Sequence, residues 1–272
     1  MTKEEIEPKA LLPALKKELG SECEGVDDQY LLMFLYWKAS VKRAAERYRD
    51  FLKWKKSEKG SFDETLRITK DPELERLLLS EVMVSPPSLL TKEGGPIMLG
   101  RFRNNDMTDG RTTEGVCRMM FYNIDRLLQR EETQKYGITI IHDLRGFDKA
   151  KNARIEIAKR LFKGFLGQFP IQVKAIYICQ APMVFIGFFK IVSTLLMPKK
   201  LRERIHFIDE FHELNDVYDV VDPKDLLTEM GGALEWSIQD WVDEQKKKEL
   251  SGDSTVWSSL TDVNPKSETE TK

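Results

Sequence analysis

The stretch Lys174–His206 constrains the fold of this 272-residue chain more than any other. It carries no charged residue from Ala175 to Phe189, and it ends in a dense basic block. A membrane-spanning helix needs roughly 20 apolar residues. This run is shorter, and Pro182 interrupts it. We interpret the stretch as a buried strand, a proline-marked turn and a strongly apolar helix that could cover a cavity.

Short apolar runs alternate with longer amphipathic segments in the second half of the chain. The runs at 138–144 and 173–179 are rich in β-branched residues, which is typical of strands buried on both faces, and the run at 205–208 predicts a third short strand. Apolar residues at helical spacing predict helices at 113–128 and, after a cap at Asp148, up to 169. This alternation predicts an α/β fold with a mostly parallel sheet flanked by helices.

The N-terminal part has a helical pattern instead. Asp27 or Asp28 could cap one helix, and Ser40 stands where the N-cap of the next is expected. The charged face of that second helix, which includes Arg47, is expected to be solvated surface. Asp71 followed by proline predicts a further short helix through 79. We expect these helices to form a small bundle.

Composition suggests three regions. Residues 1–84 would be the helical bundle, and the proline pair at 86–87 marks a change to the α/β domain of residues 85–245. Residues 246–272 are too poor in apolar groups to fold, so we expect a disordered polar tail.

The overall charge and the cysteines exclude several functional classes. A net charge of −2 gives no global case for nucleic-acid binding. Cys23, Cys117 and Cys179 lack metal-like spacing, and their odd number argues against a disulfide framework. The charged, amphipathic start has no apolar core of a secretory signal, so a cytoplasmic protein is expected.

The chain contains none of the common catalytic motifs. There is no nucleophile elbow, phosphate-binding loop or dinucleotide-binding glycine pattern, and the histidines form no zinc motif. We therefore expect no enzyme, no metal and no cofactor, although an active site built from distant residues is an alternative. His142 shares a strand face with Ile138 and Ile140, which favours a core or pocket histidine. Asp143 at the strand end is expected to anchor the following turn.

The basic block directly follows the apolar helix. It contains Lys199, Lys200, Arg202 and Arg204. By itself such a run is usually a solvated face. Beside an exposed apolar helix, however, cations suit an anionic membrane surface, at about 1 kcal/mol each.

Four segments in order resemble the CRAL-TRIO lipid-binding family. They are GITIIHDLRGFD, LGQFPIQVKAIYICQAP, FFKIVSTLLMPKKLRERIHFID and DLLTEMGG. The resemblance runs from about 93 to 232 and is nearest to the branch that contains alpha-tocopherol transfer protein, retinaldehyde-binding protein and clavesin. It implies a hydrophobic pocket that holds one lipid and is closed by a gate helix at roughly 184–198.

The resemblance also implies site residues. The pocket-facing set would be Cys117, Met120, Ile124, Ile138, Ile140, His142, Leu161, Phe165, Phe169, Ile176 and Ile178. Lys200 and Arg204 keep the spacing of basic residues that contact a phosphoinositide headgroup in relatives, and Lys190 and Arg202 are further candidates. Of three positions in the bundle that are basic in relatives, Met33, Tyr36 and Lys38, only the last is basic here.

Two functions therefore stand as hypotheses. The first is binding and inter-membrane transfer of a tocopherol-, retinoid- or other isoprenoid-like lipid by a monomer, with release at phosphoinositide-containing membranes. The second is a phosphoinositide-dependent adaptor, recruited to membranes in signalling or vesicle trafficking.

Overall fold

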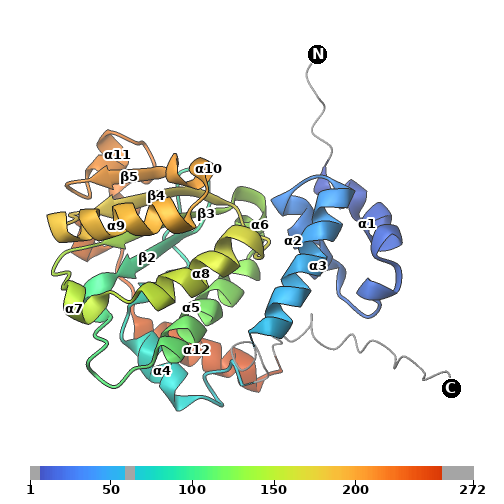
Figure 1. Ribbon diagram of the computed structural model, residues 1–272, viewed down its shortest axis with the longest axis horizontal. Coiled ribbons are helices and arrows are strands. Elements are labelled where there is room, and N and C mark those ends of the chain that lie inside the picture. The colour runs from blue at the N-terminus through green and yellow to red at the C-terminus, as the bar shows by residue number, and fades with distance from the viewer. Residues whose placement is uncertain (1–6, 59–64, 253–272) are drawn as a thin grey trace.

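The computed structural model describes residues 7–58 and 65–252 (Figure 1). Helices α1 (Leu12–Leu19), α2 (Asp28–Trp37) and α3 (Val41–Ser57) form a bundle at one side of a larger α/β body. Short 3₁₀ turns, η1 (Pro8–Leu11) and η2 (Gly20–Cys23), flank α1. Ser40 occupies the N-cap position of α3, as predicted, but its side chain makes no capping hydrogen bond.

The α/β body is built on a five-stranded sheet in the order β1-β2-β3-β4-β5. The strands are β1 (Met83–Val84), β2 (Ile97–Arg101), β3 (Ile138–Asp143), β4 (Val173–Cys179) and β5 (Ile205–Ile208). Only β1 is antiparallel to its neighbour. The predicted α/β fold with a mostly parallel sheet is confirmed.

Helices connect the strands. They are η3 (Phe102–Asn104), α5 (Thr113–Leu128), α6 (Glu131–Tyr136), α7 (Lys149–Asn152), α8 (Ile155–Gly167), α9 (Met183–Leu196) and α10 (Lys199–Arg202). The predicted cap Asp148 accepts a hydrogen bond from Ala150, so it begins the short α7 rather than the long helix. At the end of β3, Asp143 accepts a hydrogen bond of 3.0 Å from the Arg145 N–H, which confirms its predicted role in the turn.

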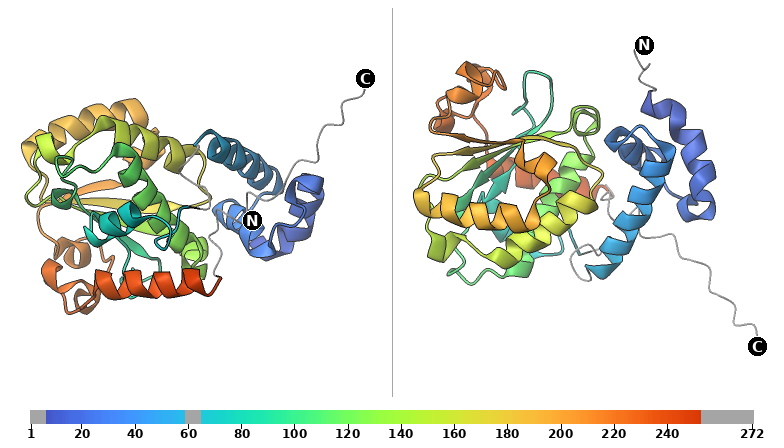
Figure 2. Two further views of the ribbon diagram at one scale, coloured as in Figure 1. Left: turned by 90° about the horizontal axis from the view of Figure 1, so that it is seen from below. Right: turned by 45° about the horizontal axis from the view of Figure 1, so that its top comes forward.

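The two faces of the sheet belong to different cores. Met98, Ile140 and Ile176 align across β2, β3 and β4 and belong to the core shared with α5, α8 and α9. The next residues along these strands, Leu99, Ile141 and Tyr177, lie on the opposite face and pack with the C-terminal segment. This segment contains α11 (Glu213–Asp216), η4 (Pro223–Asp225) and η5 (Thr228–Met230). Figure 2 shows α9 and this segment on opposite sides of the sheet. The cavity described below lies on the α9 side.

Aromatic side chains attach the bundle to the body. Trp54 of α3 contacts Phe121 of α5 and Phe169, with ring centroids 5.7 and 5.0 Å apart. A Cβ on Gly164 of α8 would lie 2.6 Å from the Phe169 ring and 3.0 Å from the Trp54 ring, so only glycine permits this approach. One hydrophobic core therefore spans both units.

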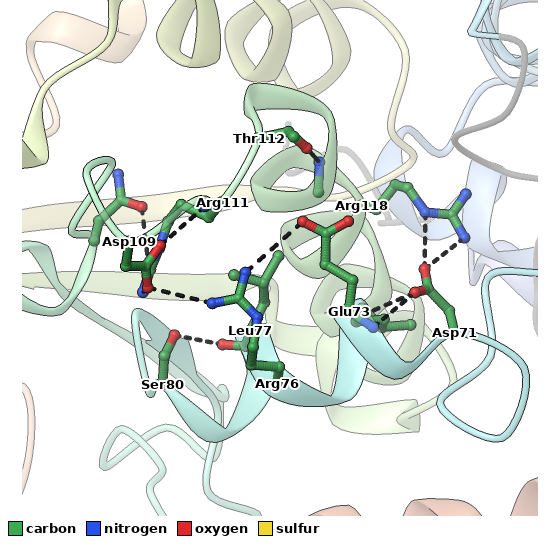
Figure 3. A network of polar contacts seen from close by, with 12 residues as sticks. Asp71, Glu73, Arg76, Leu77, Ser80, Asp109, Arg111, Thr112 and Arg118 are labelled. Carbon is green, nitrogen blue, oxygen red and sulfur yellow. Dashed lines mark hydrogen bonds and ion pairs between the residues drawn. The ribbon is translucent and has the colours of Figure 1, made fainter.

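Helix α4 (Pro72–Leu79) was expected in the bundle, but it packs against α5 and α12 (Ile238–Leu250) in the body (Figure 1). Figure 3 shows the polar contacts that hold it there. Asp71 caps α4 through the Glu73 and Leu74 N–H groups and pairs with Arg118 of α5 at 3.1 Å. At the other end, Arg76 pairs with Asp109 at 3.3 Å. A cap that also binds an arginine on another helix could not be read from local sequence.

The C-terminal helix α12 (Ile238–Leu250) extends beyond residue 245, where a disordered tail was predicted. The reason is Glu249, which is 6% exposed. Its carboxylate accepts hydrogen bonds from the Ile68 N–H, the Thr69 N–H and hydroxyl, and the Tyr122 hydroxyl, at 2.8–3.0 Å. The remainder of the predicted tail, from residue 253, lies outside the described residues.

Replacing Glu249 by Gln is expected to lower the free energy of unfolding by roughly 3 kcal/mol, because one amide oxygen cannot accept from four donors. Urea denaturation measures the change. The matched control is Glu244→Gln on the same helix, whose exposed ion pair with Lys248 should contribute no more than about 0.5 kcal/mol. Equal effects of the two substitutions would contradict the assigned role of Glu249.

Candidate functional site: a cavity beneath α9

A cavity of about 1310 Å³ lies between the sheet and helices α5, α8 and α9, and it extends to the bundle. Sites for drug-sized molecules measure about 300–1,000 Å³, so this one suits a larger ligand. Its wall beneath α9 is largely apolar. It includes Met98, Met120, Ile140, Leu161, Ile176 and Phe185.

Five phenylalanines hold α9 over this cavity, and we call them the gate cluster: Phe102, Phe147, Phe185, Phe189 and Phe207. Phe185 of α9 is 3% exposed and meets Phe102 and Phe147 edge to face, with centroids 5.8 and 5.2 Å apart. Phe189 stacks on Phe185 at 5.7 Å and also contacts Phe207 of β5. Aromatic pairs of this geometry stabilise by about 0.5–1.5 kcal/mol each beyond their buried area.

The outer face of α9 is apolar and open to solvent. Met183, Ile191 and Leu195, which lie on one side of the helix with Gly187, are 81%, 59% and 70% exposed. Lys190 and Thr194 are exposed among them. A group of large apolar side chains this exposed usually marks a contact with a membrane or a partner. No helix in the described ranges is long and apolar enough to span a bilayer.

Five of the predicted pocket residues line the cavity: Met120, Ile140, His142, Leu161 and Ile176. They come from α5, β3, α8 and β4, which the fold brings around one space. Whether they contact a ligand remains a prediction.

Five others are buried in packed core instead of lining the cavity: Cys117, Ile124, Ile138, Phe169 and Ile178. Phe169 packs against both Trp54 and Phe121 at the junction with the bundle. Burial raises the pKa of the Cys117 thiol to about 12. Strand alternation gives the face on which a residue lies, but it does not reveal whether that face meets a void or a packed helix. The side chain of Phe165 lies outside the described part of the structure.

His142 is the most unusual group on the wall. The side chain lies deep among protein atoms but keeps accessible surface, because it borders the cavity. Its Nδ1 is buried and has no hydrogen-bond partner among the described residues. Burial lowers the pKa of His142 to about 4, so the imidazole is neutral at physiological pH.

The four predicted basic residues form two pairs. Lys200 and Arg204 line the main cavity, and the Arg204 guanidinium donates to the Val173 carbonyl. Lys190 and Arg202 instead line a separate groove of about 300 Å³ between α9 and β5, together with Ile186 and Phe207. The structure therefore does not bring all four to one place.

Comparison with known proteins agrees with this architecture. The CRAL/TRIO domain model matches residues 88–232, more than half of the chain. The chain belongs to the CRAL/TRIO family. This is a family of lipid-binding and lipid-transfer domains, not of catalysts, and it includes proteins in which the domain is one part of a longer chain.

The sequence identity to individual relatives is low. The chain is 27% identical to the alpha-tocopherol transfer protein-like proteins of Pongo abelii and Homo sapiens over 226 residues, 82% of this chain and 64% of theirs. It is 30% identical to tyrosine-protein phosphatase non-receptor type 9 of Rattus norvegicus over 127 residues, which is 46% of this chain but 20% of the phosphatase. The crystal structure of Sfh5 shares the fold, with a TM-score of 0.55 and 13% identity over 90% of this chain and 95% of that one.

The sequence did not single out Arg47 of this CRAL/TRIO protein, which was assigned to a solvated face. Its guanidinium lies over the Trp37 ring at 3.9 Å and lines the cavity. The Nη1 atom is buried and has no hydrogen-bond partner in the described chain. Burial lowers the pKa of Arg47. Only the tertiary fold, which places α3 beside the cavity, reveals this group.

Arg47 belongs to a set of cations at the bundle end of the cavity that we call the basic rim. It consists of Lys9, Lys38, Arg47, Lys135, Lys174, Lys200 and Arg204. Gln172 fixes the bundle here by donating to the Tyr36 and Trp37 carbonyls at 3.0 and 2.9 Å. Glu7 and Glu131 are the acidic residues among the described lining, so this end of the cavity is positively charged.

The depressed pKa of His142 predicts how stability depends on pH. An unfolded histidine titrates near pH 6.5, so below that value the unfolded chain binds a proton that the folded chain excludes. Stability therefore falls as the pH drops from 6.5 towards 4. Between pH 7.5 and pH 5 this contributes a loss of about 2 kcal/mol.

Urea denaturation at both pH values should show that His142→Phe removes this part of the loss. His212→Phe, at an exposed site, should retain it. An unchanged pH dependence in His142→Phe would contradict the lowered pKa of His142.

Proposed function

We propose that this protein binds one hydrophobic lipid in the cavity beneath α9 and transfers it between membranes. The observation that carries the proposal is an apolar cavity whose covering helix has an apolar outer face as well. The match to a lipid-binding family and the similarity to alpha-tocopherol transfer protein-like proteins support it. The protein would act as a cytoplasmic monomer that contacts membranes transiently.

Binding needs no charged contact in the apolar part of the cavity. A lipid that buries about 400 Å² of apolar surface gains about 10 kcal/mol. Association and ordering costs remove several kcal/mol of this gain. Affinity in the micromolar to nanomolar range follows. At such an affinity the lipid dissociates slowly, so its release must be promoted.

Release would occur at an anionic membrane through α9. Its inner face closes the cavity through the gate cluster, and its outer face offers Met183, Ile191 and Leu195 to the bilayer. Next to it, Lys200 and Arg204 of the basic rim would pair with lipid phosphates, and Arg47 could do so from the bundle side. A phosphoinositide suits such a cluster because its headgroup carries several negative charges. The membrane would shift the population towards the open state by binding that state more tightly.

Replacing Ile191 and Leu195 together by Ser should weaken binding to vesicles about tenfold, because the pair loses roughly 1.4 kcal/mol of burial in the bilayer. Vesicle co-sedimentation measures the effect. The matched control replaces Val217 and Leu250 by Ser, two apolar residues that are 63% and 77% exposed away from α9. Equal losses for the two double variants would show that α9 is not the contact surface.

Replacing Lys200 and Arg204 together by Ala should slow lipid transfer to phosphoinositide-containing acceptor vesicles several-fold, since each cation contributes about 1 kcal/mol at the surface. Transfer to neutral vesicles should change little. The control with the same loss of charge is Lys224→Ala with Lys247→Ala, at exposed sites outside the cavity. Unchanged transfer to the anionic acceptors would refute the role of the pair.

The adaptor hypothesis uses the same exposed face and basic residues but needs no carried lipid. The two therefore differ in whether the purified protein contains a stoichiometric lipid, not in whether it binds vesicles.

A further inference from the structure

The imidazole of His142 lies on the cavity wall. The proposed closure by α9 and release at the membrane give it no role. A neutral imidazole has one N–H to donate and one nitrogen that accepts. Nδ1 is buried and has no hydrogen-bond partner among the residues described, and leaving such an atom unpaired away from water is costly. A histidine on the wall of an otherwise apolar part of the cavity points to a partner that arrives with the ligand.

The ring is held firmly by its neighbours. His142 lies opposite Gly100 in the sheet, and a Cβ at Gly100 would lie 2.7 Å from Nδ1. Phe102 contacts the ring edge to face, with centroids 5.0 Å apart. Nδ1 is enclosed on this side, whereas Nε2 is not among the buried unpaired atoms, and the ring lines the cavity. A ligand would therefore meet the Nε2 edge.

The other polar side chains on the wall away from the basic rim already have partners. The Asn105 amide donates to the Asn152 carbonyl at 3.2 Å, and the Asn152 amide donates to the Asn105 carbonyl at 3.2 Å. The Arg154 guanidinium donates to the Ala150 carbonyl at 2.9 Å. Within the described lining, His142 is left as the unsatisfied group of this region.

We infer that His142 hydrogen-bonds an uncharged hydroxyl or carbonyl group of the bound lipid and thereby selects among lipids of similar size. The inference rests on the proposed function, since it requires that a lipid enters the cavity. An uncharged partner fits a buried neutral imidazole better than a carboxylate or phosphate does, because burying an anion requires a paired positive charge.

The position of His142 also orients the lipid. The basic rim reaches β4 at its first residues, Val173 and Lys174, whereas His142 aligns with Ile178 near the end of that strand. Five residues of strand separate the two by about 16 Å. Phe102 touches both His142 and Phe185 of α9. The hydrogen-bonding group therefore lies deep, behind the gate cluster, and the apolar remainder extends towards the rim.

The test compares two probes of equal chain length, tritiated 1-octadecanol and tritiated octadecane, offered to the full-length protein from neutral vesicles. Equilibrium partition to the protein gives a preference for the alcohol in each variant. His142→Phe should reduce this preference about tenfold relative to wild type, because it removes the hydrogen bond and keeps an aromatic ring. His142→Gln should retain part of it, and His212→Phe, at an exposed site outside the cavity, should retain all of it.

The outcomes separate the two claims. Loss of the preference in His142→Phe, with unchanged binding of octadecane, supports the inference. Binding of both probes with the same preference in wild type and His142→Phe overturns it and leaves the proposed function intact. Failure of wild type to bind either probe counts against the proposed function itself. Thermal unfolding checks each variant, and His142→Leu replaces His142→Phe if the larger ring prevents folding.

Discussion

The structure depends on one requirement: α9 must cover an apolar sheet face without filling the space above it. The edge-to-face contacts of Phe185 with Phe102 and Phe147 meet this requirement at one end of the helix. Phe189 and Phe207 extend the contact to the edge strand β5. Phe102 also contacts His142 of β3, at one end of the cavity floor. The other rings contact one another, and Ile140 and Ile176 of the sheet border an open volume.

The same requirement explains why the helix is apolar on both sides. Its inner residues close the cavity, and Met183, Ile191 and Leu195 remain in water at some cost. Ordinary folding would place polar residues there. An apolar outer face is useful only if the helix has a second environment, and the adjacent Lys200 and Arg204 suit an anionic surface.

Much of this fold could be predicted from local patterns. The short apolar runs predicted the bounds of β4 and β5, and helical spacing predicted those of α5. Burial of one face of a regular element produces a periodic pattern of apolar residues in the sequence. Contacts between residues that are distant in sequence produce no such pattern. The position of α4 depends on the Asp71–Arg118 pair, and the last turns of α12 depend on donors at Ile68, Thr69 and Tyr122.

The site was predictable to a similar degree and for the same reason. Strand alternation placed Ile140 and His142 on the correct face, yet Ile138 and Ile178 on that face are covered by packed side chains. Arg47 resembled a solvated residue because the sequence does not show that α3 lies beside the cavity. The unpaired Nδ1 of His142 is likewise a property of the surroundings that the fold creates.

Native mass spectrometry of the full-length protein, purified without detergent from the cells that express it, tests the central claim most directly. The account predicts a species heavier than the bare chain by one lipid mass, which organic extraction removes and identifies as a hydrophobic lipid. A bare chain that nevertheless binds anionic vesicles would contradict the account and would favour the membrane-recruited adaptor.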